Sequence, residues 1–226
     1  MQAAEVPPEL QAVFDRAKAM VGQFFKEASS RPEVGRIEVG GDRYMMARSD
    51  SFSHVLRGVL AEIYGEKGSD QILYNFGKAI GQQEAGQFHK RFQLTDPLEK
   101  FGVGPTYFSY SGWAFISLLA PSKPEASEDF LLVFTNQGSF EAEAFQKAGE
   151  KVDAPVCHIS AGYLAGWCQE SFGIPLECRE IMCRGQSDPL DLFVMAHRKR
   201  ILAAAENTAR LINENKDLTK AGIFGE

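Results

Sequence analysis

The stretch PVCHISAGYLAGWCQESFGIPLECREIMCRGQSDPLDLFVMAH, residues 155–197, predicts a helix followed by a β-hairpin. Small and apolar residues recur at helical intervals over 156–172, and Gly173 is a typical C-terminal stop. Residues 174–183 and 190–197 have the composition of strands, and the polar segment between them predicts a turn. All four cysteines of the chain lie in this stretch, so we expect a chemical site here if the protein has one.

Two features of this stretch require particular surroundings. Gly162 and Gly166 lie four residues apart on the predicted helix and leave a groove in which another backbone can pack closely. In regular alternation Glu180 shares a strand face with apolar residues, so its carboxyl group must be paired, protonated or bound to a cation. Cys183 would point to the opposite face from Glu180 unless the strand ends or bends near Met182.

Four residues that could bind a metal follow the spacing C-x22-E-x2-C-x7-D, namely Cys157, Glu180, Cys183 and Asp191. Further matches are Pro155-Val156-Cys157, Gly162-Tyr163, Gly166, Asp188 and Phe193. This pattern resembles the vinyl-reductase (4VR) domain superfamily, which includes the aromatic-sensing N-terminal domain of xylene- and phenol-responsive bacterial activators. The resemblance implies that Cys157, Glu180, Cys183 and Asp191 occupy a structural zinc site.

Asp191 stands where the family has its last cysteine, and it leaves two interpretations open. Aspartate can ligate zinc through oxygen, but two thiolates with two carboxylates form a harder and weaker site than three thiolates with one carboxylate. In the first interpretation the chain binds about one zinc ion in such a site. In the second, zinc has been lost and the four residues are ordinary core positions.

Composition and charge exclude several classes of function. The net charge of −6 over 226 residues argues against a general nucleic-acid-binding surface. No apolar run reaches the roughly 18 residues that a membrane span needs, and the N-terminus has no secretory signal. Clustered cysteines without such a signal indicate reduced thiols or metal ligands, so we expect a cytoplasmic protein.

The first half of the chain predicts helices and one hairpin. Apolar residues over 10–25 form a helical stripe that either covers the core or packs on a second subunit. Gly40-Gly41 predicts the hairpin turn, and Asp50 can cap the helix that follows.

A longer helix is predicted after Ser69 or Asp70. Its Gly77 and Gly81 indicate close helix packing or room beside a ligand. His89 lies among polar residues and is expected to be solvated.

The aromatic segment PTYFSYSGWAFISLLAP, residues 105–121, predicts one or two strands with a bulge or bend at Gly112. A pocket for an apolar or planar ligand would be lined by Tyr107, Phe108, Tyr110, Trp113, Phe115 and Phe134. The alternative is that these rings simply fill the core. The resemblance aligns Phe108 and Asn136 with the ligand-contacting histidine and the tryptophan of the phenol sensors, which argues against phenol as the ligand.

These patterns and the resemblance together predict an α+β fold, in which an antiparallel sheet and packed helices enclose a ligand cavity. We expect an N-terminal helical extension over 1–34, the ligand-binding domain over 35–200 and a helical tail over 201–226. The leading function is a stand-alone sensor or carrier for a hydrophobic or aromatic ligand, acting as a homodimer and signalling through a partner protein because no output domain is expected.

Two alternatives stay open for the function. One is an enzyme or assembly factor related to tetrapyrrole vinyl reduction, which rests on analogy of fold alone. The other is a non-enzymatic scaffold protein with a filled core. We name no catalytic residue, because no nucleophile is paired with a base and no flavin or nicotinamide motif is present in the sequence.

Overall fold

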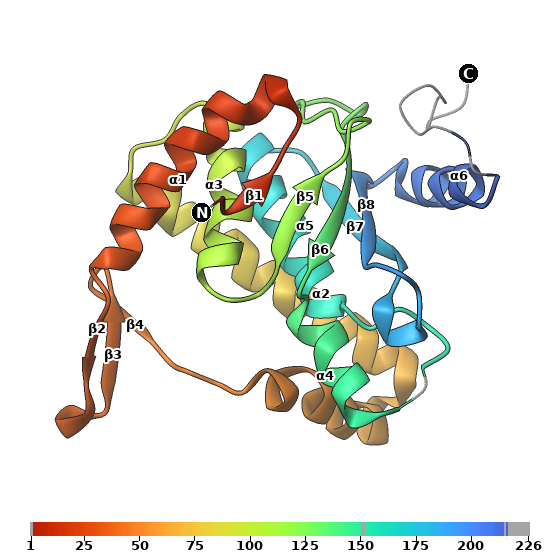
Figure 1. Ribbon diagram of the computed structural model, residues 1–226, viewed down its shortest axis with the longest axis horizontal. Coiled ribbons are helices and arrows are strands. Elements are labelled where there is room, and N and C mark those ends of the chain that lie inside the picture. The colour runs from red at the N-terminus through yellow and green to blue at the C-terminus, as the bar shows by residue number, and fades with distance from the viewer. Residues whose placement is uncertain (1, 151, 215, 217–226) are drawn as a thin grey trace.

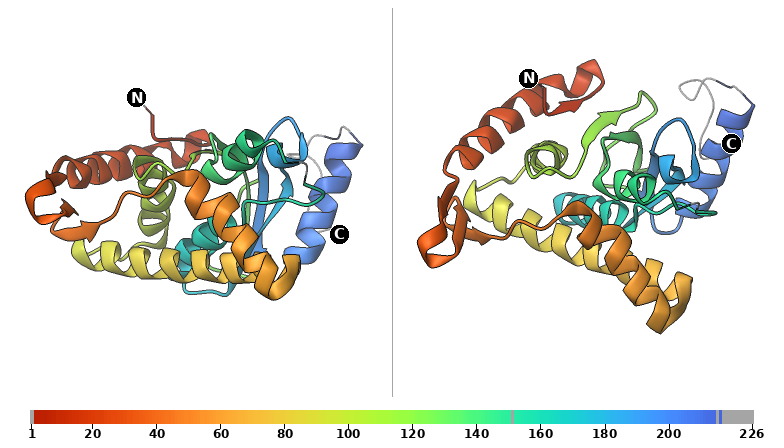
Figure 2. Two further views of the ribbon diagram at one scale, coloured as in Figure 1. Left: turned by 90° about the horizontal axis from the view of Figure 1, so that it is seen from below. Right: turned by 60° about the horizontal axis from the view of Figure 1, so that its bottom comes forward.

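The computed structural model describes residues 2–150, 152–214 and 216, which form helices on both sides of a five-stranded sheet (Figure 1). On one side of the sheet lie α1 (Gln11–Lys26), α2 (Leu56–Arg91), α3 (Pro97–Tyr110) and α5 (His158–Phe172). On the other side α6 (Ile201–Asn213) packs alone (Figure 2). The short helix α4 (Phe140–Ala148) lies beside the lower end of the sheet in Figure 1. The predicted α+β class is confirmed.

The main sheet has the strand order β1 (Ala4–Glu5), β5 (Phe115–Leu118), β6 (Leu131–Gln137), β8 (Leu192–His197), β7 (Leu176–Met182). All neighbours are antiparallel except β1, which runs parallel to β5. Because side chains alternate along a strand, Phe134 and Phe193 face the main core, whereas Val133 and Val194 face α6. The two faces of the central strands are therefore both buried.

The stretch over 155–197 folds as predicted into a helix and a hairpin. α5 begins at His158, slightly later than the proline suggested, and ends at Gly173, whose left-handed φ of 67° lets the chain turn. β7 and β8 pair from Leu176 and His197 onward, with an irregularity between Glu180 and Met182. This β-bulge is the bend that the spacing of Glu180 and Cys183 requires.

Glycines from two helices bring α2 and α5 into backbone contact. A Cβ atom at Gly77 would lie 2.2 Å from the carbonyl oxygen of Ile159, and one at Gly81 would lie 2.1 Å from that of Tyr163. In return, Gly162 and Gly166 face backbone carbonyls of α2 at 2.0 and 2.1 Å. The predicted close packing is confirmed, and the missing side chains are what allow it.

The predicted hairpin forms a small separate sheet of β2 (Ser29–Arg31), β3 (Arg36–Val39) and β4 (Asp42–Tyr44), which lies at the far end of α1 (Figure 1). From β4 the chain runs in an extended segment to a π-helical turn, η3 (Ser51–Val55), where the carboxylate of Asp50 accepts a hydrogen bond from the Ser51 N–H. The turn continues into α2, which Gly65 breaks with a φ of 72°. Short 3-10 turns complete the fold: η1 (Pro8–Leu10), η2 (Pro32–Val34) and η4 (Arg184–Gln186).

The strand prediction for the aromatic segment is wrong over its first half. Residues 105–110 belong to α3, and only Phe115–Leu118 forms a strand. The helix starts before the segment, where Asp96 caps it by accepting from the Glu99 N–H and Pro97 occupies the first turn. It then runs on through Pro105, so the cap outweighed the β-propensity of the tyrosines and phenylalanine.

The prediction of a solvated His89 is also wrong. The side chain is buried, packs edge-on against Trp167 at 5.7 Å between ring centroids, and has Nε2 3.4 Å from the Lys100 carbonyl oxygen. Burial lowers the pKa of His89 to about 4, so the ring is neutral at pH 7.

The apolar stripe of α1 is buried by its own chain. Phe14 packs on Phe101 of α3, and Phe24 packs on Phe88 of α2 and on Tyr107. α6 covers the outer face of the sheet, and the predicted tail beyond residue 216 lies outside the described residues. None of the described helices is long and apolar enough to cross a membrane.

Candidate functional site

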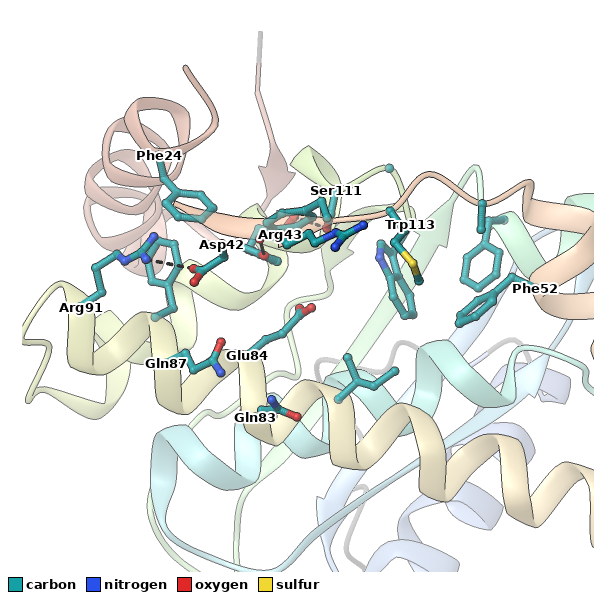
Figure 3. Close-up of a pocket in the computed structure, with 18 of the residues that line it drawn as sticks. Phe24, Asp42, Arg43, Phe52, Gln83, Glu84, Gln87, Arg91, Ser111 and Trp113 are labelled. Atoms are coloured by element: carbon teal, nitrogen blue, oxygen red, sulfur yellow. Dashed lines mark hydrogen bonds and ion pairs between the residues drawn. The ribbon is translucent and has the colours of Figure 1, made fainter. Parts of the chain in front are cut away.

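A cavity of about 930 Å³ lies between α2 and the segment that follows β4 (Figure 3). Its aromatic lining consists of Phe24, Tyr44, Phe52, Phe88, Tyr107, Trp113 and Phe140. Its polar lining comes from α2 and from the end of the hairpin, and consists of Asp42, Arg43, Gln83, Glu84, Gln87, Lys90 and Arg91, together with Ser49 and Ser111. Such a largely apolar hollow with a few polar groups has the size and character of a small-molecule site.

Hydroxyl groups and one carboxylate meet on the wall of the cavity. The Tyr163 hydroxyl donates a hydrogen bond of 2.5 Å to Oε2 of Glu84, and the hydroxyls of Tyr44 and Tyr107 contact each other. The pKa of Glu84 is raised, mainly by burial, while the hydrogen bond from Tyr163 works against that rise. Burial likewise raises the pKa values of Tyr44, Tyr107 and Tyr163, so all three remain neutral phenols at pH 7.

The helix contact described above places Glu84 on this wall. Glu84 lies less than one turn after Gly81, and its partner Tyr163 is the residue whose carbonyl faces Gly81. The distance between the two helices therefore sets the distance between the carboxylate and the phenol.

A second acid on the cavity rim is already neutralised. Asp42 accepts from Arg91 at 2.9 Å, and the Arg91 guanidinium lies 5.2 Å from the centroid of the Phe24 ring. Arg43 is exposed and reaches the backbone carbonyl of Gly35 at 3.4 Å. The rim is thus charged and solvated, whereas Glu84 lies deeper.

The six aromatic residues predicted to line a pocket do not lie together. Tyr107 and Trp113 line the cavity. Phe108 and Phe134 are fully buried, the former between Trp113 and Tyr163 and the latter stacked on Phe193 at 5.3 Å. Tyr110 stacks on Phe25 at the surface, and Phe115 is partly buried in β5.

Several residues of the cavity were missed by the sequence analysis. Glu84 is the clearest, because it follows Gly77 and Gly81 on the face of α2 that packs inward. An acidic residue on a stripe of small residues is a signal that could have been used. Tyr44 and Phe52 gave no such signal, because they reach the cavity only through the path of the chain after the hairpin.

A second cluster lies at the other end of α5, where Cys157, Glu180, Cys183 and Asp191 come together. One ligand atom from each lies within 4.8 Å of all the others. Cys157 is the N-cap of α5, Glu180 and Cys183 flank the bulge at the end of β7, and Asp191 directly precedes β8. The structure therefore brings all four predicted metal ligands together.

Hydrogen bonds satisfy this cluster only in part. The backbone N–H of Cys157 donates to Oε2 of Glu180 at 2.9 Å, but the buried Oε1 has no partner among the described residues. Asp191 is 1% exposed and accepts from the backbone N–H and from Nε of Arg184 at 2.7 and 2.9 Å. Asp188 accepts from the Cys183 N–H at 2.8 Å and so holds the turn.

The charges in the cluster are uneven. Burial raises the pKa of Cys157 and of Glu180, and the neighbouring acidic groups raise both further. The pKa of Cys183 is lowered to about 6, chiefly by its hydrogen bond with Cys157. A thiolate beside an orphaned carboxylate oxygen is a donor set that fits a cation such as Zn²⁺, with Arg184 already compensating part of the charge of Asp191.

The Ser139-Phe140-Glu141 segment supports this cluster from behind. Oγ of Ser139 lies 3.3 Å from Sγ of Cys157. The buried carboxyl group of Glu141 accepts from the N–H groups of Ile159 and Ser160 at 2.9 and 2.7 Å, and so caps α5, whose own N-cap residue makes no side-chain bond. The start of the helix is thereby held next to β7.

Comparison with known proteins gives two family matches. Residues 24–120 match the family model described as activator of aromatic catabolism, and residues 132–195 match the model of the vinyl-reductase (4VR) domain. The first segment contains most of the cavity lining, and the second contains all four residues of the cysteine–carboxylate cluster. No curated protein matches the chain.

The fold also matches solved structures. One of these is the crystal structure of the phenol-responsive sensory domain of the transcription activator PoxR with phenol, which has a TM-score of 0.71 and 18% sequence identity. The alignment covers 91% of this chain and 98% of that one, so the two chains share their fold over nearly their whole length. The resemblance drawn from the sequence is confirmed: the chain carries an activator-of-aromatic-catabolism segment followed by a vinyl-reductase (4VR) domain.

Proposed function

We propose that the protein is a sensor or carrier that binds a small hydrophobic or aromatic ligand in the cavity between α2 and the segment after β4. The observation that carries this proposal is the cavity itself, about 930 Å³ in volume, with rings on both sides and polar groups grouped on one wall. The fold shared with a phenol-responsive sensory domain supports it. The ligand is expected to differ from phenol, because Phe108 and Asn136 replace the contact residues that the resemblance implies.

Binding would be transmitted through the elements that surround the cavity. The segment after β4 connects the hairpin to α2, and both ends of it contribute lining residues. A ligand that fills the space would fix this segment against α2 and Trp113. A downstream signalling protein and a homodimer complete the proposal, and light scattering tests the dimer.

A structural zinc ion in the cysteine–carboxylate cluster belongs to the same proposal. Cys157 and Cys183 would supply thiolates, and Glu180 would supply its unpartnered oxygen. The ion would tie the start of α5 to the hairpin of β7 and β8. It would also remove the repulsion between the acidic groups that burial forces together.

A thermal-shift screen tests the ligand proposal. The purified protein is heated with a panel of monocyclic aromatics, fatty acids and tetrapyrroles, and at least one class should raise the melting temperature in a saturable way. Trp113→Ala should reduce that stabilisation. If no class stabilises the protein, the scaffold alternative is favoured instead.

A further inference from the structure

The oxygen atoms on the wall of the cavity offer more hydrogen-bond acceptors than donors. An ionised carboxylate has about four acceptor positions, and Glu84 uses one of them, for the hydroxyl of Tyr163. The hydroxyls of Tyr44 and Tyr107 bind each other, which leaves one of their two protons free. A ligand group rich in N–H donors would satisfy this wall.

Glu84 also lacks a positive partner. Among the described residues that line the cavity, Asp42 is paired with Arg91, whereas Glu84 forms no ion pair. Lys90 and Arg43 are exposed at the rim, where water screens their charge. Figure 3 shows Glu84 extending from α2 toward the segment above it.

Aromatic rings lie near the carboxylate on the same side of the cavity. Tyr163 packs against Trp113 at 4.7 Å between centroids, and Tyr107 is part of the same group of rings. Ring faces attract cations, most strongly when both are shielded from water. A carboxylate together with electron-rich rings is the combination that recognises organic ammonium groups.

We infer that the cavity selects ligands that carry a primary ammonium group on an apolar or aromatic body, with the nitrogen held by Glu84 and the body held by the rings. This inference rests on the proposed function and adds the chemical class of the ligand to it. Tyr163 is a positioning residue, because its hydrogen bond orients the Glu84 carboxylate toward the cavity. Neutral ligands of the same shape would leave the carboxylate desolvated and unpaired.

Isothermal titration at pH 7.5 with three probes of one shape tests the inference. 2-Phenylethylamine should bind about tenfold more tightly than 2-phenylethanol or more, since a hydrogen bond to a charged group contributes about 1.5–3 kcal/mol, and 3-phenylpropanoate should bind worst. Glu84→Gln should remove the preference for the amine while the alcohol still binds.

Glu62→Gln is the matched control, because Glu62 lies on α2, is exposed and is outside the cavity. The preference should survive in this variant. Equal binding of amine and alcohol overturns the inference but leaves the proposed function intact, as does an amine preference that persists in Glu84→Gln. If none of the three probes binds, the inference is overturned, and the wider ligand panel decides whether the proposed function stands.

Discussion

Replacing Gly81 by alanine should destabilise the protein by forcing α2 away from α5. The added Cβ would lie 2.1 Å from the Tyr163 carbonyl oxygen, whereas ordinary contacts begin at 3.4 Å. The obstacle is backbone within a helix, so no side-chain rotation relieves the clash. Overpacking of this kind costs about 1–3 kcal/mol.

Alanine also has the higher helix propensity, which returns about 0.5–1 kcal/mol. The backbone contact places the overpacking cost at the upper end of its range, so we expect a net loss of about 2 kcal/mol in the free energy of unfolding. Because Glu84 lies next to this contact, its hydrogen bond to Tyr163 should lengthen as well.

Gly58→Ala is the control for this prediction. Gly58 also lies in α2, but a Cβ there would meet nothing within 4 Å. This variant should be more stable than the wild type by about 0.5–1 kcal/mol, through helix propensity alone. Urea denaturation followed by circular dichroism measures both values. If Gly81→Ala proves as stable as Gly58→Ala, the close packing of α2 on α5 is refuted.

Three further predictions concern the cysteine–carboxylate cluster, the cap of α5 and the buried histidine. Protein purified without chelator should contain about one zinc per chain by elemental analysis, Cys183→Ala should lose the zinc and melt earlier, and Asp191→Cys should bind it more tightly; little zinc together with an unchanged Cys183→Ala melting temperature would contradict this. Glu141→Ala should lower the free energy of unfolding by at least about 2 kcal/mol, because two buried N–H groups lose their acceptor, and unchanged urea denaturation would refute the cap. The pKa of His89 is lowered to about 4 in the folded state, so the unfolded chain binds more protons between pH 6.5 and 4. The free energy of unfolding should therefore fall by about 1–3 kcal/mol as the pH drops through that window, and the same slope in His89→Gln would count against this.

The part of the fold that local patterns determine could be predicted from the sequence. The glycines four residues apart on two helices led to the contact between α2 and α5, and the position of Glu180 three residues before Cys183 led to the bulge in β7. The position of α3 could not be predicted from the composition of residues 105–110, because the cap that starts this helix lies earlier, at Asp96. Propensity within a segment is overridden when its neighbour already fixes the backbone.

The candidate sites differ in how far the sequence could reach. The four residues of the cysteine–carboxylate cluster share one motif, so their spacing alone brought them together. The cavity is assembled from four separate parts of the chain, and its lining depends on the path from β4 to η3, which no local pattern encodes. His89 was misjudged for a related reason, since Trp167, which covers it, is far away in the sequence.

The two tryptophans of the chain allow a direct test of ligand binding in the cavity. Trp113 lines the cavity, whereas Trp167 is buried and its indole N–H donates to the Lys100 carbonyl at 3.1 Å. In a ¹⁵N-labelled protein these groups give separate indole resonances, which can be followed while the best ligand of the thermal-shift panel is added. We predict that the Trp113 resonance moves saturably and that the Trp167 resonance stays in place. A ligand that raises the melting temperature yet leaves Trp113 unmoved would contradict binding in this cavity.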